Sequence, residues 1–126
     1  MKIEVSNGEI VDKITILQLK KEFITDPNKL VNVENELNEL SPLLEEILLT
    51  PFLSTLYTLL YDTNKSLWKI EDDLRDKERN QEFDSEFIEL ARSVYFTNDE
   101  RAKIKKDINT ASGSKLVEEK SYQEYK

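Results

Sequence analysis

Apolar residues recur every three or four positions along most of this chain, the spacing that places them on one face of an α-helix. The longest unbroken pattern covers residues 51–80, where one mostly apolar line runs from Leu53 to Leu74. We predict one long helix over this range, with Thr50 as its N-cap and Pro51 in its first turn. A helix of this length and pattern is typical of the central element of a helical bundle.

A second line of residues lies one position round from the apolar line and is mostly polar. Its members are Asn64, Trp68, Glu71, Arg75 and Glu78. Charges beside an apolar line need partners on a neighbouring element if they are buried. This second line is therefore where the long helix is expected to carry a function.

Shorter patterns predict the helices that come before it. Ser6 and Glu9 have the spacing of a capping box, which begins a broadly apolar helix that ends near Thr25. A helix that is apolar over more than half its girth is expected to lie between neighbours. Asp26 is the expected N-cap of the second helix, which should pair antiparallel with the first. Pro42 then caps or kinks the chain, and a short apolar piece leads into the long helix.

The last predicted helix follows a tight connection after residue 80. Asp84 or Ser85 caps its start, and Gly113 ends it in a left-handed conformation. The residues after Thr97 resemble another capping box, so either a new helix begins at Asn98 or one helix bends there. Because no proline or glycine interrupts the segment, we expect a bent but nearly continuous helix.

These elements predict an all-α fold, an antiparallel bundle of four to five helices built on the long one. We expect a single domain over residues 1–126, with the bundle in residues 1–113 and a C-terminal arm, residues 114–126, that packs back on it. The chain contains only two glycines and three prolines. This composition favours helices, because a β-fold would need many more turns.

Composition also excludes several kinds of chemistry. The chain has no cysteine and no histidine, which excludes disulfides, thiol catalysis, thiolate metal sites and imidazole acid–base catalysis. Its formal net charge of −8 argues against binding to nucleic acid or to an anionic membrane. No signal peptide or membrane-spanning segment is recognisable, so we expect a cytoplasmic protein. We expect no cofactor and no bound metal.

The long helix and its successor are expected to form a hairpin that turns near residue 82. Residues at equal distances from the turn then face each other, which brings opposite charges such as Arg75 and Glu89 together. On the last helix, one otherwise apolar stripe turns polar at Asn98, Arg101 and Lys105. Such groups are costly to bury unless they are paired.

Two interpretations of this polar network remain open. It fixes the register of the hairpin, or it lines a pocket for a small polar ligand such as a phosphate, a carboxylate or a sugar. The residues that would bind this ligand are Asn64, Trp68, Glu71, Asp72, Arg75, Arg92, Asn98, Arg101, Lys105 and Tyr122. No catalytic residue can be assigned. Acidic pairs such as Glu36 and Glu39 do not match the magnesium-binding pattern of all-helical nucleotide pyrophosphohydrolases.

Four blocks of the sequence form a recognisable set. They are GEIVDKITIL (8–17), LWKIEDDLRDKE (67–78), FIELARSVYFTNDERAKIKKDIN (87–109) and KLVEEKSYQEY (115–125). In this order they resemble an uncharacterised family of small bacterial and phage proteins, often encoded near glycosyltransferase or surface-polysaccharide genes. The resemblance implies a link to glycan or envelope metabolism. Because it includes the C-terminal arm, we also expect Tyr122 and either Glu118 or Glu119 to approach the polar network.

The hypothesis favoured by these patterns is a non-enzymatic helical module that acts through protein contact or as an accessory to glycan enzymes. Its expected partner is another protein or a second copy of the chain. The alternative is a small-ligand-binding protein or enzyme that uses the polar network. An apolar surface patch or a symmetric dimer would support the module. A concave pocket containing Arg92, Arg101 and Glu71 would support the alternative.

Overall fold

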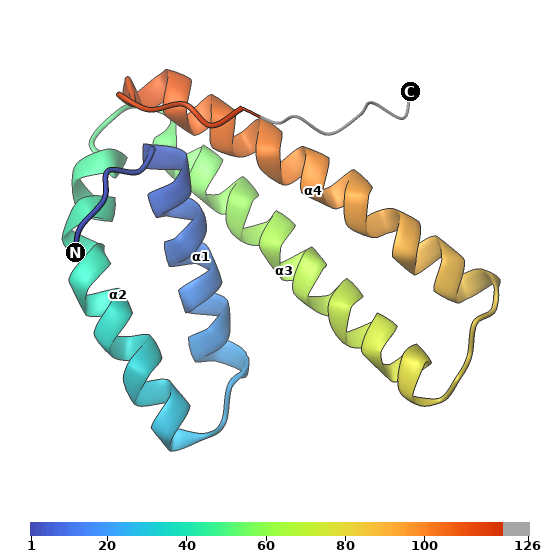
Figure 1. The fold of residues 1–126 in the computed structure, drawn as a ribbon. Helices are drawn as coiled ribbons and strands as arrows, with labels where there is room; N and C mark the ends of the chain where they lie inside the picture. The colour runs from blue at the N-terminus through green and yellow to red at the C-terminus, as the bar shows by residue number, and fades with distance from the viewer. Residues whose placement is uncertain (120–126) are drawn as a thin grey trace.

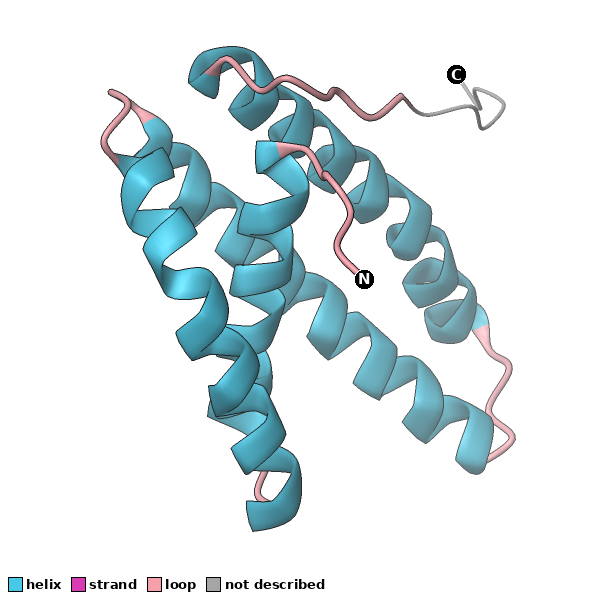
Figure 2. Ribbon diagram, turned by 60° about the vertical axis from the view of Figure 1, so that its left-hand side comes forward, coloured by secondary structure: helices cyan, strands magenta, loops and turns pink. Residues whose placement is uncertain are grey.

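The computed structural model of this chain describes residues 1–119. Within them it contains four α-helices and no strand, which confirms the predicted all-α fold (Figure 2). The helices are α1 (Asn7–Phe23), α2 (Pro27–Leu48), α3 (Leu53–Arg79) and α4 (Ser85–Ser112). None of the described helices combines the length and the apolar character needed to cross a membrane.

The helices form two antiparallel hairpins, α1–α2 and α3–α4, which meet at one end of the molecule and diverge toward the other (Figure 1). α1 packs against α2, α3 and α4, whereas α2 makes only slight contact with α3. The broad apolar face of α1 explains this central position. Its side chains at Val11, Ile14, Leu17 and Leu19 are at most 2% exposed.

The hydrophobic core lies where the two hairpins meet. All fully buried residues of the described chain fall within residues 6–64 or at 108–109. One cluster brings together all the helices of the bundle, because it contains Val11, Ile47, Leu53, Leu60 and Ile108. Burying an aliphatic side chain of this size stabilises the folded state by about 1.5–3 kcal/mol. The closed end is therefore the stable part of the fold.

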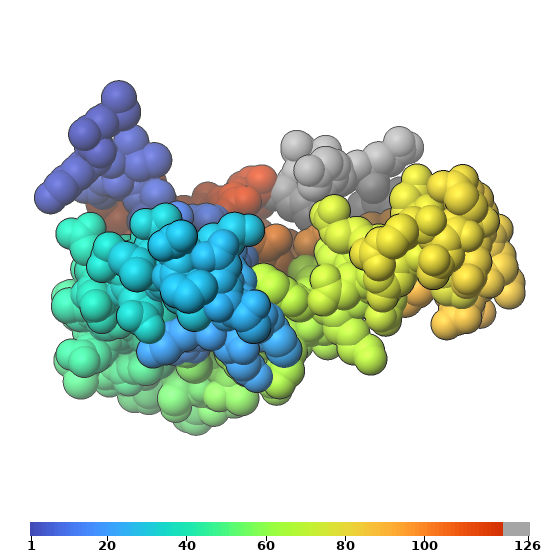
Figure 3. Space-filling model, turned by 90° about the horizontal axis from the view of Figure 1, so that it is seen from below, coloured from blue at the N-terminus to red at the C-terminus, as the bar shows by residue number. Residues whose placement is uncertain are grey.

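The α3–α4 hairpin extends well beyond this core. We call residues 65–98 the outer hairpin, and none of them is fully buried. Figure 3 shows the turn of this hairpin, in yellow, as a lobe set apart from α1 and α2, in blue and cyan. The outer hairpin is thus a two-helix projection on a four-helix base.

Most of the predicted helix ends are confirmed by the hydrogen bonds of their caps. The Ser6 hydroxyl accepts a hydrogen bond from the backbone N–H of Glu9 at 3.2 Å. The Asp26 carboxylate accepts one from the backbone N–H of Asn28 at 2.9 Å. The Asp84 carboxylate caps α4 in the same way at 2.9 Å. Gly113 ends α4 with φ 65° and ψ 40°, the left-handed conformation expected of a glycine C-cap.

The predicted start of the long helix is wrong. Thr50 is not the N-cap, because its backbone N–H donates to the Ile47 carbonyl and so completes the last turn of α2. Pro51 lies in the turn that follows, and α3 begins only at Leu53. The N-cap is Phe52, which has φ 71° and offers no side-chain hydrogen bond. The Thr-Pro sequence does not mark the start of a helix here, because residues 49–52 form the short turn that joins α2 to α3.

Pro42 does not cap a helix, which excludes the first of its two predicted roles. α2 runs through this proline from Pro27 to Leu48, so the short apolar piece is the last part of α2. An interior proline costs a helix about 3 kcal/mol. The helix continues because both its ends are anchored: Val33 and Ile47, on either side of Pro42, are 7% and 8% exposed. The bundle therefore has four described helices, the lower of the two predicted numbers.

α4 is continuous through Thr97, which excludes a new helix beginning at Asn98. After Gly113 the chain turns back along α4, as the predicted C-terminal arm requires (Figure 1). Glu118 and Glu119 bind Lys105 and Lys106 of α4 at 3.2 and 3.3 Å. The predicted approach of Tyr122 concerns a residue outside the described part of the chain.

Candidate functional site

A buried carboxylate on α1 is the centre of the polar network. Asp12 is 1% exposed. Its Oδ1 accepts hydrogen bonds from Arg101 Nε and from Asn64 Nδ2, both at 2.9 Å, while Oδ2 accepts from Arg101 Nη2. The Asn64 amide also donates to the Thr15 hydroxyl at 2.8 Å, and that hydroxyl donates to the Asp12 carbonyl at 2.7 Å. The network therefore joins α1, α3 and α4.

The local sequence explains why these partners are needed. Asp12 lies between Val11 and Ile14 on the buried side of α1, where an unpaired carboxylate would be strongly destabilising. Arginine satisfies both carboxylate oxygens at once because its guanidinium presents two parallel N–H groups. The hydrogen bonds to Asp12 raise the pKa of Arg101.

Lys105 extends the network toward the surface. Its Nζ lies 2.8 Å from Glu9 and 3.2 Å from Glu118, and 4.0 Å from the carboxylate of Asp12. Burial lowers the pKa of Lys105, but the bond to Glu9 and the charge of Asp12 outweigh this effect and raise it overall. Three carboxylates thus surround the two cations of the network. The network holds one more negative than positive charge and is not suited to bind an anion.

α1 and α4 approach each other closely at Gly8. The Gly8 N–H donates to the Asn109 side-chain carbonyl at 2.6 Å. A Cβ at this position would lie 2.5 Å from the Lys105 carbonyl oxygen, so only glycine fits. One residue earlier, the Asn7 backbone and side chain bind Ser114 and Ser112 at 3.0 and 2.9 Å. The start of α1 is therefore held firmly against the end of α4.

The buried groups of this network satisfy one another. In the described part of the chain, every buried side-chain nitrogen and oxygen has a hydrogen-bond partner. The same residues contain no group of three or more acidic side chains arranged to hold a metal ion. The arrangement therefore acts as a polar cross-link between three helices, since its acids and bases are already engaged with each other.

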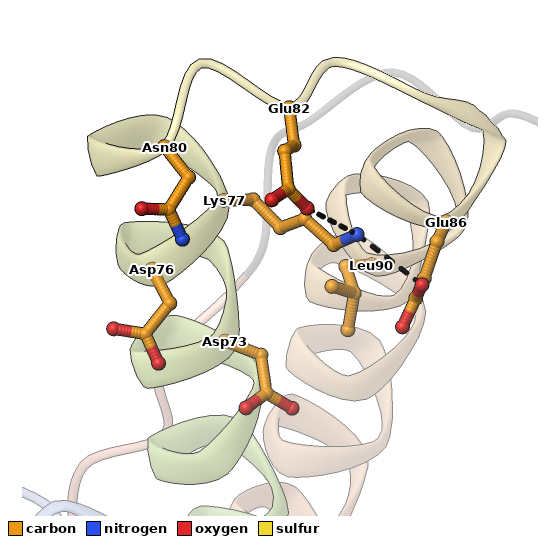
Figure 4. A pocket seen from close by; sticks show the side chains of 7 residues that line it. All are labelled: Asp73, Asp76, Lys77, Asn80, Glu82, Glu86 and Leu90. Atoms are coloured by element: carbon orange, nitrogen blue, oxygen red, sulfur yellow. Dashed lines mark hydrogen bonds and ion pairs between the residues drawn. The ribbon is translucent and has the colours of Figure 1, made fainter.

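A second charged cluster lies at the tip of the outer hairpin. Lys77 binds Glu82, Asp84 and Glu86 at 3.2, 3.0 and 3.2 Å, and its side chain reaches across the turn between α3 and α4 (Figure 4). The hydrogen bond to Asp84 is the main reason why the pKa of Lys77 is raised. A shallow hollow lies beside it, lined also by Asp73. The lysine offsets part of the negative charge of this acidic turn.

The structure divides the predicted ligand-binding residues into two groups. Asn64, Arg101 and Lys105 meet in the network around Asp12. The others that are described lie on the outer hairpin, away from it. They are Trp68, Glu71, Asp72, Arg75, Arg92 and Asn98. Tyr122 is outside the described residues. The sequence therefore located part of the network.

The residues of the outer hairpin make local contacts. Trp68 stacks on Phe23 at the end of α1, with ring centroids 5.6 Å apart. Arg75 pairs with Glu71 of its own helix at 3.6 Å, in place of the predicted Glu89. The guanidinium of Arg92 lies 5.9 Å from the ring centroid of Phe96 on the same helix. Trp68 is therefore a packing residue, and the other two contacts join residues one turn apart.

Sequence reasoning missed the α1 members of the network, which are Glu9, Asp12 and Thr15. A signal was present: Asp12 is the single acidic residue in the middle of the broad apolar face of the first helix. Such a residue must have a charged or polar partner elsewhere in the fold. The helix that supplies it could not be identified from local spacing.

The polar line on α3 is explained by α1, which lies along it. Tyr57 bonds Gln18, Tyr61 bonds Glu22, Asn64 bonds Asp12 and Trp68 stacks on Phe23. A second line of residues, on α4, contacts α1 at two positions: Lys105 bonds Glu9, and Asn109 accepts a hydrogen bond from the Gly8 N–H. α1 ends at Phe23, so both lines continue into the outer hairpin without it.

We call this continuation the outer face. It consists of Glu71, Arg75 and Glu78 on α3 and of Ile88, Ala91, Tyr95 and Asn98 on α4. These α4 positions follow Lys105 and Asn109 back along the helix at alternating spacings of three and four, which keeps them on one side. Ile88 and Tyr95 are 56% and 42% exposed.

Comparisons with known proteins place the chain in a family. Neither the comparison with curated proteins nor the comparison with solved structures finds a match. A family model matches residues 1–125, and it describes a family of unknown function, DUF6165. This match confirms the predicted membership of a family without an assigned role. Since it spans almost the whole sequence, the chain belongs to the DUF6165 family.

Proposed function

We propose that this protein is a helical protein-interaction module and that its outer face is the surface that contacts the partner. The observation that carries this proposal is the absence of any fully buried residue in the outer hairpin, residues 65–98, although both of its helices keep a regular apolar pattern. A helix hairpin normally buries its apolar stripes against a further layer. Here the further layer is missing beyond the end of α1.

Four exposed apolar side chains lie on the outer hairpin. Phe83, Ile88, Tyr95 and Phe96 are 53%, 56%, 42% and 39% exposed. Scattered apolar residues are normal on protein surfaces, and exposed ones also occur on the other helices of the described chain. Ile88 and Tyr95 support the proposal because they lie on the outer face, where no further layer covers them.

The way α1 packs on the base of the hairpin supports a helix as the partner element. α1 lies along the two lines that continue into the outer face, and it uses both apolar and charged contacts there. A partner helix that lies along α3 and α4 beyond the end of α1 would cover Ile88 and Tyr95 and would meet the charges of Glu71 and Arg75. Helices are therefore the best-matched partner elements.

The alternative, binding of a small polar ligand by the network, stays a prediction. The network around Asp12 supports a structural role, because its buried groups bond to one another. A thermal-shift screen with phosphates, sugars, nucleotides and dicarboxylates tests this alternative. A ligand at about a hundred times its dissociation constant would stabilise the protein by about 2.7 kcal/mol. The link to glycan or envelope metabolism likewise remains a prediction from the resemblance.

Site-specific photo-cross-linking in the cells that produce this protein tests the interaction surface. A photoreactive amino acid replaces Ile88 on the outer face or, as a control, Val31 on α2. The two positions are matched, since both are branched apolar residues on helices and are 56% and 57% exposed. We expect a covalent protein adduct from position 88 and none from position 31. No adduct from position 88, or equal adducts from both, would contradict the proposal.

A further inference from the structure

We propose that the partner of the outer face is a second copy of this chain, docked antiparallel about a two-fold axis that passes close to Ala91. This inference rests on the proposed function, because it names the occupant of the same surface. The two outer hairpins would form an intermolecular four-helix bundle, in which α4 packs on α4 of the other copy and α3 on its α3.

The shape of the outer face matches its own copy. In an antiparallel two-fold arrangement, positions on α4 meet in pairs that are symmetric about the axis. Ile88 and Tyr95 flank Ala91 at distances of three and four residues. Ile88 of each copy would then pack on Tyr95 of the other. The small side chain of Ala91 would let the two helices come close at the axis.

The charges of the outer face are also self-complementary. The position opposite Ala91 on α3, counted from the hairpin turn between Arg79 and Ser85, lies between Glu71 and Arg75. In an antiparallel pair about this point, Glu71 of each copy faces Arg75 of the other. Both residues are exposed and pair with each other only within their own helix, at 3.6 Å. Two reciprocal ion pairs could thus form across the axis.

The charge distribution along the hairpin favours the antiparallel orientation over the parallel one. Residues 73–89, at the tip, contain seven acidic and three basic side chains, a formal charge of −4. Residues 90–106 contain five basic and two acidic ones, a formal charge of +3. Three of these cations, Arg101, Lys105 and Lys106, are already paired with carboxylates of their own chain. The orientation is therefore decided by the acidic tips, because antiparallel docking keeps them apart whereas parallel docking would place them together.

The end of α1 carries positive charges that are complementary to the acidic tip of a second copy. Lys20 and Lys21 lie in the last turn of α1, where the outer face begins. The acidic tip of the second copy would approach this turn. The negative end of the α1 dipole also lies there, and the charges of Lys20 and Lys21 offset it. The contact with the tip would therefore be made through the lysine side chains.

Analytical ultracentrifugation over a range of concentrations tests the dimer. We expect the full-length chain to dimerise and Ile88→Lys to raise the dissociation constant of the dimer by at least about tenfold, since it places a charge at the centre of the contact. The matched control Val31→Lys should dimerise as the unaltered chain does. Circular dichroism of both variants would show whether the helices are retained.

Disulfide cross-linking tests the orientation, and the absence of native cysteine makes it clean. A mixture of the single variants Ile88→Cys and Tyr95→Cys should form linked dimers more readily than either variant alone, because a disulfide needs Cα atoms within about 7 Å. The proposed geometry would be overturned if a mixture of Ile88→Cys with Val31→Cys formed linked dimers as readily as the mixture of Ile88→Cys with Tyr95→Cys.

The outcomes separate this inference from the proposed function. A chain that is monomeric at every concentration would overturn the pairing of two copies, and so would a dimer that Ile88→Lys leaves intact while Val31→Lys breaks it. The photo-cross-linking experiment decides the wider proposal. An adduct of twice the mass of the chain supports the second copy, whereas an adduct of another mass supports a different protein and overturns the pairing.

Discussion

Asp12 of α1 and Arg101 of α4 are 89 positions apart in the sequence and form a buried, two-point ion pair. Asn64 of α3 binds the same carboxylate, so one side chain connects three of the four described helices. An interaction of this kind does not add much stability compared with a well-packed apolar core. Its main effect is to select one arrangement of α1 on the α3–α4 hairpin, because any other would leave a buried charge unpaired.

Removal of the Asp12 charge is therefore expected to be strongly destabilising. Asp12→Asn keeps the size of the side chain but leaves Arg101 and Lys105 with fewer negative partners in a partly buried site. We expect a loss of about 3 kcal/mol in the free energy of unfolding, measured by chemical denaturation. The control is Asp76→Asn, which breaks an exposed pair with Arg79 and should cost less than about 1 kcal/mol. Equal losses for the two variants would contradict the role of Asp12.

The close contact of α1 and α4 predicts a clear difference between the two glycines. Gly8→Ala places a methyl group against the Lys105 carbonyl, which is rigid backbone, and should cost about 2 kcal/mol. Gly113→Ala meets nothing within 4 Å, but its φ of +65° is strained for alanine. That strain costs about 1 kcal/mol. Thermal unfolding of both variants measures the difference, and a smaller loss at position 8 than at position 113 would refute it.

The hydrogen bond between Tyr61 and Glu22 predicts a late ionisation at high pH. This bond raises the pKa of Tyr61 from 10.0 to about 12. Because the pKa is raised on folding, the bond stabilises the folded state fully below pH 10 and this contribution disappears as the pH rises through about 12. Ultraviolet titration of tyrosinate should therefore show a step near pH 12 that Tyr61→Phe removes.

Tyr57 provides the comparison for this titration. Burial raises the pKa of Tyr57 as well, with its bond to Gln18 acting in the opposite direction. Tyr57→Phe should leave the step of Tyr61 in place. If Tyr61→Phe has no effect on the late step, the bond to Glu22 does not control it.

The lysine at the hairpin tip is expected to order the turn between α3 and α4. Lys77→Gln would leave Glu82, Asp84 and Glu86 close together without their cation. Hydrogen–deuterium exchange should then accelerate in residues 80–86, because like charges repel each other there. Added salt should reduce this effect by screening. Arg79→Gln is the control, since Arg79 pairs with the exposed Asp76 of its own helix and should leave the exchange of the turn unchanged.

Local patterns predicted the helices well, and their failures share a cause. The caps at Ser6, Asp26 and Asp84 depend on hydrogen bonds within one turn, and all three are confirmed. Pro42 and Thr50 also carry local signals for a helix boundary, yet α2 continues through Pro42 and Thr50 is not the N-cap of α3. At Pro42 the reason is packing, because burial on both sides of the proline offsets its local cost.

The candidate site shows the same division. Asn64, Arg101 and Lys105 could be predicted because they are polar residues at positions where spacing requires contact with another helix. Asp12 was not assigned to the site, because nothing local states which helix a buried carboxylate will meet. The other predicted residues cannot be assigned to this network from spacing alone, because α1 ends before it reaches most of them.

By itself the sequence determined the helices, their approximate ends, the all-α fold and the existence of a polar line beside an apolar one. These features depend on side-chain periodicity and on hydrogen bonds that span only a few residues. Only the tertiary structure decided that Asp12 meets Arg101 and that the polar line is covered by α1 as far as Phe23 and open beyond it. Those outcomes depend on where α1 ends and on how two hairpins diverge, which helix packing sets and local spacing does not.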